Sequence, residues 1–136
     1  MYPRLFLNAG GSVLLLLGVA GFANVFTESR SPSFWLDPGE NIAHAALAVI
    51  ALAAVLVPGL RTSLAPHHRA LAGLIGLVLV FFGAYGATLP PGDAMHPNTF
   101  GLANLENPAD NLIHLVIGLV AVASALIRSE AEAQAA

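Results

Sequence analysis

Two stretches of eight residues decide the fold of this chain. Residues 37–44 read DPGENIAH, and residues 107–114 read NPADNLIH. At this offset of 70 both stretches carry Pro second, an acidic residue fourth, Asn fifth and His eighth. Each stretch opens an apolar run that is long enough to cross a bilayer as a helix. The chain is therefore expected to contain one helical unit twice.

Four apolar runs extend outward from these stretches. They cover residues 5–26, 38–57, 70–88 and 108–127. At about 1.5 Å per residue each run spans roughly 30 Å, which matches the hydrocarbon core of a membrane. The first run is interpreted as a span and not as a cleaved signal peptide, because it is long and no small-x-small cleavage site follows it. We expect one membrane domain, residues 1–136, as an all-α integral membrane four-helix bundle of two tandem helical hairpins, residues 5–58 and 69–128.

The composition excludes several classes of protein. The chain is 57% hydrophobic and only 10% charged, whereas soluble domains carry about 25% charged residues. Its five basic residues are all Arg and its net charge is −3, so it has no basic patch for nucleic acid. Without Cys it has no thiolate nucleophile and no Cys-ligated metal. The bilayer is therefore the expected surrounding.

The arginines predict the orientation in the membrane. Arg4, Arg61, Arg69 and Arg128 lie on one side of the four runs, and only Arg30 lies on the other. Basic residues accumulate in cytoplasmic loops of multi-pass proteins. Both termini are therefore expected on the cytoplasmic side.

The first residues of each repeated stretch have the pattern of a helix cap. Asp37 and Asn107 are N-cap residues in this interpretation, and each is followed by a Pro, which suits the first helical position. Glu40 and Asp110 come three residues after the caps and complete the form of a capping box. These four residues are therefore expected to cap helices.

The last residues of each stretch form a polar layer below the cap. Asn41 and His44 in the first hairpin, and Asn111 and His114 in the second, share a helix face at i, i+3 spacing. Since unpaired polar groups are costly in hydrocarbon, each pair needs an inward partner. Two interpretations stay open. Either the four side chains hydrogen-bond across the hairpins and fix their register, or the histidines ligate a haem or a (bacterio)chlorophyll-type pigment.

Small residues complement this layer in the first and third runs, which align at an offset of 65. Glycine pairs at i, i+3 spacing let another helix, or a flat ring, approach closely. We expect these glycines to serve helix packing. They are Gly11, Gly18 and Gly21 in the first run, and Gly76, Gly83 and Gly86 in the third.

Other activities have weaker signals. Met95 and His96 in the second outer loop are candidate copper or zinc ligands together with His44 and His114. A proton relay would stop halfway, because no ionisable residue lies between His44 and Pro58 in the second run. No phosphate-binding loop, Ser-elbow or metalloprotease motif is present. We therefore expect a protein that is not an enzyme.

Residues 111–119, which read NLIHLVIGL, resemble a known family. They are similar to the N-L-x-H-L-x-x-G run in the last helix of an uncharacterised bacterial family of small four-span membrane proteins, a domain of unknown function. The first hairpin departs from the run, with Ala48 where Gly118 stands. The resemblance implies an integral membrane protein of unestablished activity. The expected location is the bacterial inner membrane, as a multi-pass protein. The expected role is an accessory or assembly subunit, whose partners are other membrane subunits or further copies of the chain.

Overall fold

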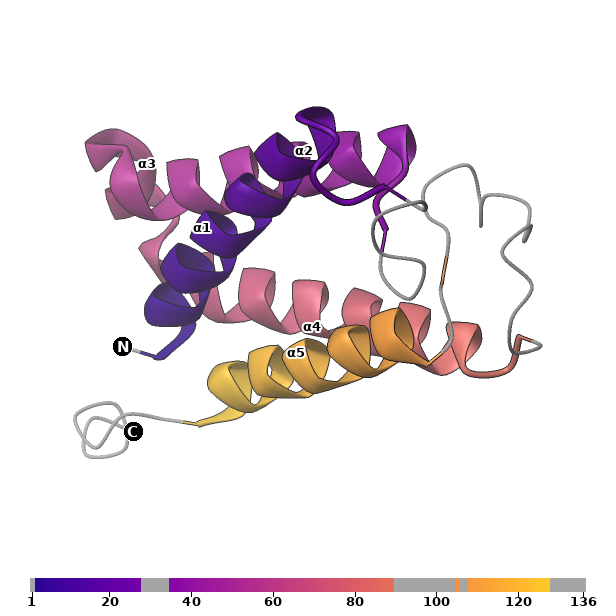
Figure 1. Cartoon of the computed structure of the whole chain (residues 1–136). Helices are drawn as coiled ribbons and strands as arrows, with labels where there is room; N and C mark the ends of the chain where they lie inside the picture. Colours follow the sequence, from indigo (N-terminus) through magenta and orange to yellow (C-terminus); the bar gives the residue numbers. More distant parts are fainter. Residues whose placement is uncertain (1, 28–34, 90–104, 106–107, 128–136) are drawn as a thin grey trace.

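The computed structural model describes residues 2–27, 35–89, 105 and 108–127, and this part of the chain is all-helical without a strand (Figure 1). The elements are α1 (Tyr2–Phe22), α2 (Pro38–Leu56), α3 (Pro58–Ser63), the 3-10 helix η1 (Ala65–His67), α4 (His68–Gly86) and α5 (Ala109–Leu126). Four helical segments are long and apolar enough to cross a membrane, and the third of them runs from Ala65 to Gly86. They confirm the expected all-α architecture with four spans and indicate a multi-pass membrane protein.

The first span ends earlier than the hydrophobic pattern predicts. Asn24 has a φ of 55°, in the left-handed region. Its N–H donates to the Gly21 carbonyl at 2.9 Å, and the Val25 N–H donates to the Ala20 carbonyl at 3.0 Å. These two bonds form a Schellman motif, which satisfies carbonyls that the helix end leaves open. Asn, one of the few residues that tolerate this conformation, therefore ends the helix while the sequence is still apolar.

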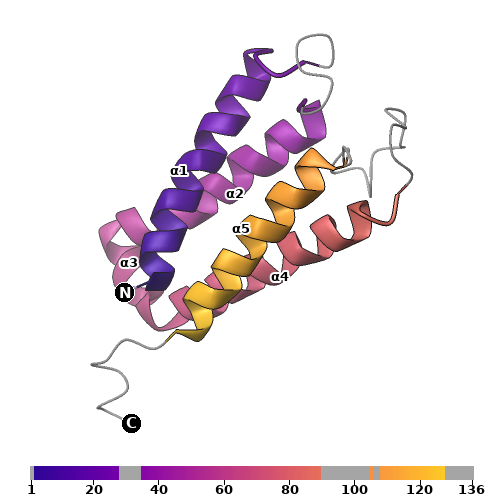
Figure 2. The same ribbon diagram turned by 60° about the horizontal axis from the view of Figure 1, so that its bottom comes forward.

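The helices pack as two antiparallel pairs. α1 lies along α2, and α4 lies along α5 (Figures 1 and 2). α1 also touches α4 and α5, and these contacts join the two pairs. α3 and η1 connect the pairs at the end where α1 begins and α5 ends (Figure 2). The two helices of each pair are consecutive among the spanning helices of the sequence.

Repeat-related glycines contact repeat-related backbone atoms in the two pairs. A Cβ added at Gly18 would lie 3.2 Å from the Asn41 carbonyl oxygen. A Cβ added at Gly83 would lie 2.7 Å from the Asn111 carbonyl oxygen. Glycine at these positions lets the helix backbones approach more closely than any larger residue allows. The two pairs therefore share one packing geometry.

The interior contains mostly small side chains. Each spanning segment buries only 22% to 33% of its residues. Leu7, Ala51 and Val55 form the one compact apolar cluster of buried residues in the described part of the chain. The other fully buried helical apolar residues are alanines, at positions 48, 54, 72 and 121. Large apolar side chains consequently face outward, toward lipid or other protein.

A candidate histidine site between the hairpins

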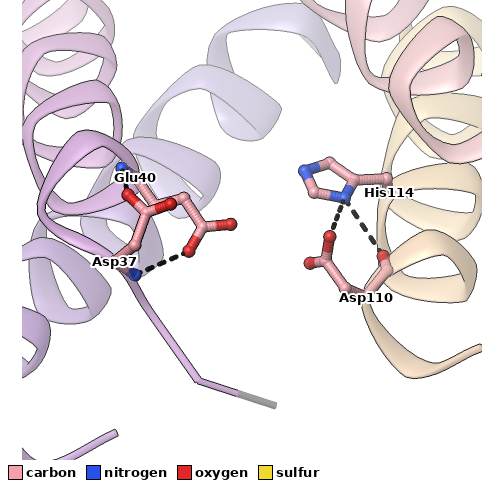
Figure 3. Close-up of polar contacts among 4 residues, drawn as sticks. All are labelled: Asp37, Glu40, Asp110 and His114. Carbon is pink, nitrogen blue, oxygen red and sulfur yellow. Dashed lines mark hydrogen bonds and ion pairs between the residues drawn. The ribbon is translucent and has the colours of Figure 1, made fainter. Parts of the chain in front are cut away.

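The beginning of α2 carries the capping box that its sequence pattern indicates. The Glu40 N–H donates to Asp37 Oδ1 at 2.8 Å, and the Asp37 N–H donates to Glu40 Oε2 at 2.8 Å (Figure 3). Both side chains are buried. Two N–H groups that the first turn would leave without partners are thus satisfied reciprocally. The cap fixes where α2 starts and hence which residues below it face the second hairpin.

The beginning of α5 differs from the expected cap. The helix starts at Ala109, one residue later than the pattern predicts, and Pro108 occupies the cap position in a helical conformation without a side-chain bond. Asn107 lies outside the described residues. Asp110 is therefore the second helical residue and not the third. Its carboxylate turns to His114, whose Nδ1 lies 3.2 Å from Asp110 Oδ2 and 3.1 Å from the Asp110 carbonyl oxygen (Figure 3). The carbonyl contact has hydrogen-bond geometry, and the contact with the carboxylate is an ion pair only when the imidazole is protonated.

His44 and His114 line one cavity between the hairpins. The cavity has a volume of about 90 Å³, and Asp110 is the one carboxylate among the described residues that line it. Apolar residues of all four spanning helices, among them Leu14, Leu47 and Leu79, form the remaining walls. The His44 Nδ1 is buried and has no hydrogen-bond partner within residues 2–27, 35–89, 105 and 108–127. The site thus places two imidazoles and one carboxylate in an apolar environment.

The Glu40 side chain, at the start of α2, points toward α5 (Figure 3). In Figure 3 the Glu40 carboxylate and the His114 ring turn toward each other from α2 and α5. Phe82 of α4 is a neighbour of the imidazole, with its ring centre 6.3 Å from that of His114. His114 is therefore oriented on one side by Asp110 and bounded on another by an aromatic ring.

Asn41 and Asn111 do not join the histidines. Each amide lies instead on a glycine of its own hairpin, Asn41 on Gly21 and Asn111 on Gly86. The Oδ1 atoms of both residues and the Nδ2 of Asn111 are buried without a hydrogen-bond partner in the described part of the chain. The expected hydrogen bonds across the hairpins are therefore absent among these residues. The four polar residues therefore do not form one layer. His44 and His114 line the cavity, and Asn41 and Asn111 lie between the two helices of each pair.

The cavity does not fit a haem or a chlorophyll-type macrocycle as the helices pack here. A cavity of about 150 Å³ holds a single benzene ring in a well-studied apolar site. The volume at His44 and His114 is smaller, and a macrocycle is several times larger than benzene. The cavity instead matches a few water molecules or one small ligand.

Among the described residues, no further metal-ligating side chains complete the site. No group of three or more His, Cys, Asp or Glu side chains that could hold a metal ion occurs in the described ranges. The loop candidates Met95 and His96 lie outside those ranges.

Arg69, which in the sequence indicated only the orientation, and its neighbour His68 make specific contacts at the opposite end of the helices. Arg69 donates from Nε to the Ala125 carbonyl at 3.0 Å, and from a terminal nitrogen to the Ala125 and Leu126 carbonyls at 2.8 and 3.2 Å. His68 Nε2 lies 3.1 Å from the Ala54 carbonyl oxygen. Arg69 thereby satisfies the open end of α5, and His68 ties α4 to α2. Contacts of this kind can be predicted where a basic residue lies beside the C-terminus of a neighbouring helix. The sequence alone does not show which helices are neighbours, so it did not predict them.

No protein-family model, no curated protein and no solved structure matches the chain. The resemblance of residues 111–119 to a family of four-span membrane proteins therefore stays a prediction.

Proposed function

We propose that this chain is a non-enzymatic accessory or assembly subunit of a complex in the bacterial inner membrane. The observation that carries the proposal is the low burial of its spans. Two thirds or more of the residues in each span lie on the outside of the structure. When so few residues are buried between the helices, much of the van der Waals contact of the helices must be with lipid or with other protein. Such contact is a main source of helix association in membranes.

The outer surface supports a role in assembly. Large apolar side chains project from all four spans, and the most exposed include Leu16 at 69%, Val49 at 61%, Leu77 at 63% and Leu119 at 59%. The polar groups of the described spans point mainly inward, as in the pairs Asp37–Glu40 and Asp110–His114. Such a surface suits lipid, neighbouring subunits or a further copy of the chain.

Site-specific photocrosslinking in the native membrane tests this proposal. A photoreactive amino acid is placed singly at Leu16, Val49, Leu77 or Leu119, and at Leu7 as a control, because Leu7 is only 1% exposed. We expect at least one outward position to give a defined protein adduct and Leu7 to give none. Adducts with lipid alone at all four outward positions would refute an accessory role.

The histidine site supports a second candidate, a ligand-binding subunit. A His whose Nδ1 contacts a backbone carbonyl and a carboxylate, as in His114, resembles the oriented imidazoles that bind metals and haem through Nε2. The buried, unpartnered Nδ1 of His44 lines the same cavity. Binding of a haem or pigment would require the hairpins to part. An absorption spectrum of protein extracted gently from its own membrane distinguishes the two candidates. A band that disappears in His44→Ala and His114→Ala supports ligand binding, and a spectrum without bands opposes it.

A further inference from the structure

The first turns of α1 and α4 carry equivalent arginines. Arg4 precedes Arg69 by 65 residues, which is the same offset that aligns the glycines of the two helices. In the second hairpin the Arg69 guanidinium donates to the Ala125 and Leu126 carbonyls at the end of α5. The repeat therefore places a guanidinium beside the last turn of the partner helix in both hairpins.

Arg4 makes no hydrogen bond to the last carbonyls of α2 in the described chain, unlike Arg69, which donates to the last carbonyls of α5. α2 passes through Val57 into α3, and the Val57 carbonyl accepts from the Arg61 N–H at 2.7 Å. His68 already contacts the Ala54 carbonyl. The Arg4 side chain is exposed and has neither a hydrogen-bond nor an ion-pair partner in the part of the chain that the structure describes. The Arg4 guanidinium, which occupies the same position in its hairpin as Arg69, is thus available to bind a group from outside the described chain.

Arg4 instead borders a groove between α1 and α2. The groove has a volume of about 300 Å³ and is lined by Arg4, Leu5, Asn8, Val55 and Leu56. Its two polar residues are on α1, one turn apart, while Leu5 and Leu56 present exposed apolar side chains, at 60% and 57%. A polar end and an apolar wall therefore meet in one groove at the end of a membrane span.

The charges at this end of the structure complement an anion. The start of α1, the short helix α3 and the start of α4 lie at this end (Figure 2), and they carry the three arginines of the described residues, Arg4, Arg61 and Arg69. The carboxylates of the described residues are those of Asp37, Glu40 and Asp110, at the starts of α2 and α5, which lie at the other end. No described carboxylate thus competes for Arg4. Basic residues at a membrane surface attract anionic lipids.

From these observations we infer that the groove between α1 and α2 binds an anionic phospholipid. Arg4 and Asn8 take the phosphate, and an acyl chain lies along Leu5 and Leu56. The planar guanidinium donates two parallel hydrogen bonds to phosphate oxygens, and the Asn8 amide supplies a further donor. This inference concerns a lipid and does not depend on a protein partner or on a ligand of the histidines.

Lipid binding to the full chain tests the inference. The protein is purified in a neutral detergent, and the binding of short-chain phosphatidylglycerol and phosphatidylcholine is measured by native mass spectrometry. We expect phosphatidylglycerol to be preferred and Arg4→Gln to weaken its binding about fivefold, the effect of one basic residue near a membrane. Arg61→Gln is the matched control, because Arg61 is exposed at the same end but lies outside the groove.

Several outcomes would overturn the inference. Equal binding of the two lipids, or the same loss in Arg61→Gln as in Arg4→Gln, would show nonspecific attraction. Displacement of phosphatidylglycerol by millimolar inorganic phosphate would show that the site binds free phosphate. If Arg4→Gln fails to fold, Asn8→Leu replaces it. This variant is expected to reduce phosphatidylglycerol binding and to leave phosphatidylcholine binding unchanged, and an unchanged preference would contradict the inference.

Discussion

The side-chain amide of Asn41 lies directly on the backbone of Gly21, at the point where α2 meets α1. Asn111 and Gly86 repeat this contact between α5 and α4. A polar side chain can be buried there because glycine leaves room beside the helix backbone, and the Cα–H of a glycine is a weak hydrogen-bond donor. The pairing explains why Asn and Gly occur together in both hairpins.

Replacing either glycine is expected to disrupt its hairpin. In Gly21→Ala or Gly86→Ala the new methyl group would occupy the position of the asparagine amide, so the helices must separate or the amide must rotate. Overpacking of this kind costs ~1–3 kcal/mol. Reversible unfolding in mixed dodecylsulfate micelles measures the loss.

Gly10→Ala is the matched control in the same helix. A Cβ at Gly10 meets only the Phe6 ring, at 3.8 Å, which is ordinary contact. Alanine also has the higher helix propensity, so Gly10→Ala is expected to be neutral or slightly stabilising. Equal losses at Gly10 and Gly21 would contradict the role assigned to Asn41.

Asp37→Ala is expected to destabilise α2 by removing its cap. The variant leaves the Glu40 N–H without the acceptor it has at 2.8 Å, and loss of an N-cap side chain costs ~0.5–2 kcal/mol. Asp37→Ser should recover most of the stability, since serine caps helices about as well as aspartate. Thermal unfolding followed by circular dichroism measures both variants. If serine were no better than alanine, the carboxylate would matter for its charge and not as a cap.

The sequence predicted the spans and the α2 cap because both depend on local signals. A run of apolar residues and the order Asp37, Pro38, Glu40 specify a helix and its start without reference to the rest of the chain. The end of α1 was less predictable, because a single Asn24 in the left-handed conformation stops a helix inside an apolar run.

The site was predicted only in part, because its geometry depends on neighbours. The equal spacing of Asn41–His44 and Asn111–His114 indicated one layer with four equivalent members. In the structure the asparagines and histidines are separated. The asparagine amides pack on glycines within each hairpin, while the imidazoles line the cavity between the hairpins. Because α5 starts one residue late, Asp110 does not cap the helix and its carboxylate contacts His114 instead. No pattern in the sequence indicates this shift.

Arg69→Gln is expected to release the end of α5. The variant removes a forked contact to the Ala125 and Leu126 carbonyls, and a cation at a helix C-terminus stabilises by ~0.3–1 kcal/mol. Hydrogen exchange should increase in the last turn of α5 and remain unchanged in α2. Arg69→Lys should restore only part of the protection, because an ammonium cannot form the fork. Full restoration by lysine would indicate that charge alone suffices.

Replacing the two histidines by leucine is expected to have opposite effects on stability. His44→Leu removes a buried nitrogen that has no partner in the described chain, and an apolar group of similar size in its place is neutral or stabilising. His114→Leu removes the contact of Nδ1 with the Asp110 carbonyl at 3.1 Å and with Asp110 Oδ2 at 3.2 Å, and the loss of one hydrogen bond costs ~0.5–1.5 kcal/mol. Thermal unfolding of protein made in a heterologous host measures both effects.

The same pair of variants, prepared from the native membrane, separates a packing role from a ligand-binding role. If His44 holds a ligand there, wild-type protein from that source gains stability from binding, and His44→Leu then becomes destabilising relative to it. A histidine that serves packing alone gives the same result from both sources. A destabilised His44→Leu in ligand-free protein would contradict the unpartnered state of its Nδ1, and would place a hydrogen bond where the structure has none in the described residues.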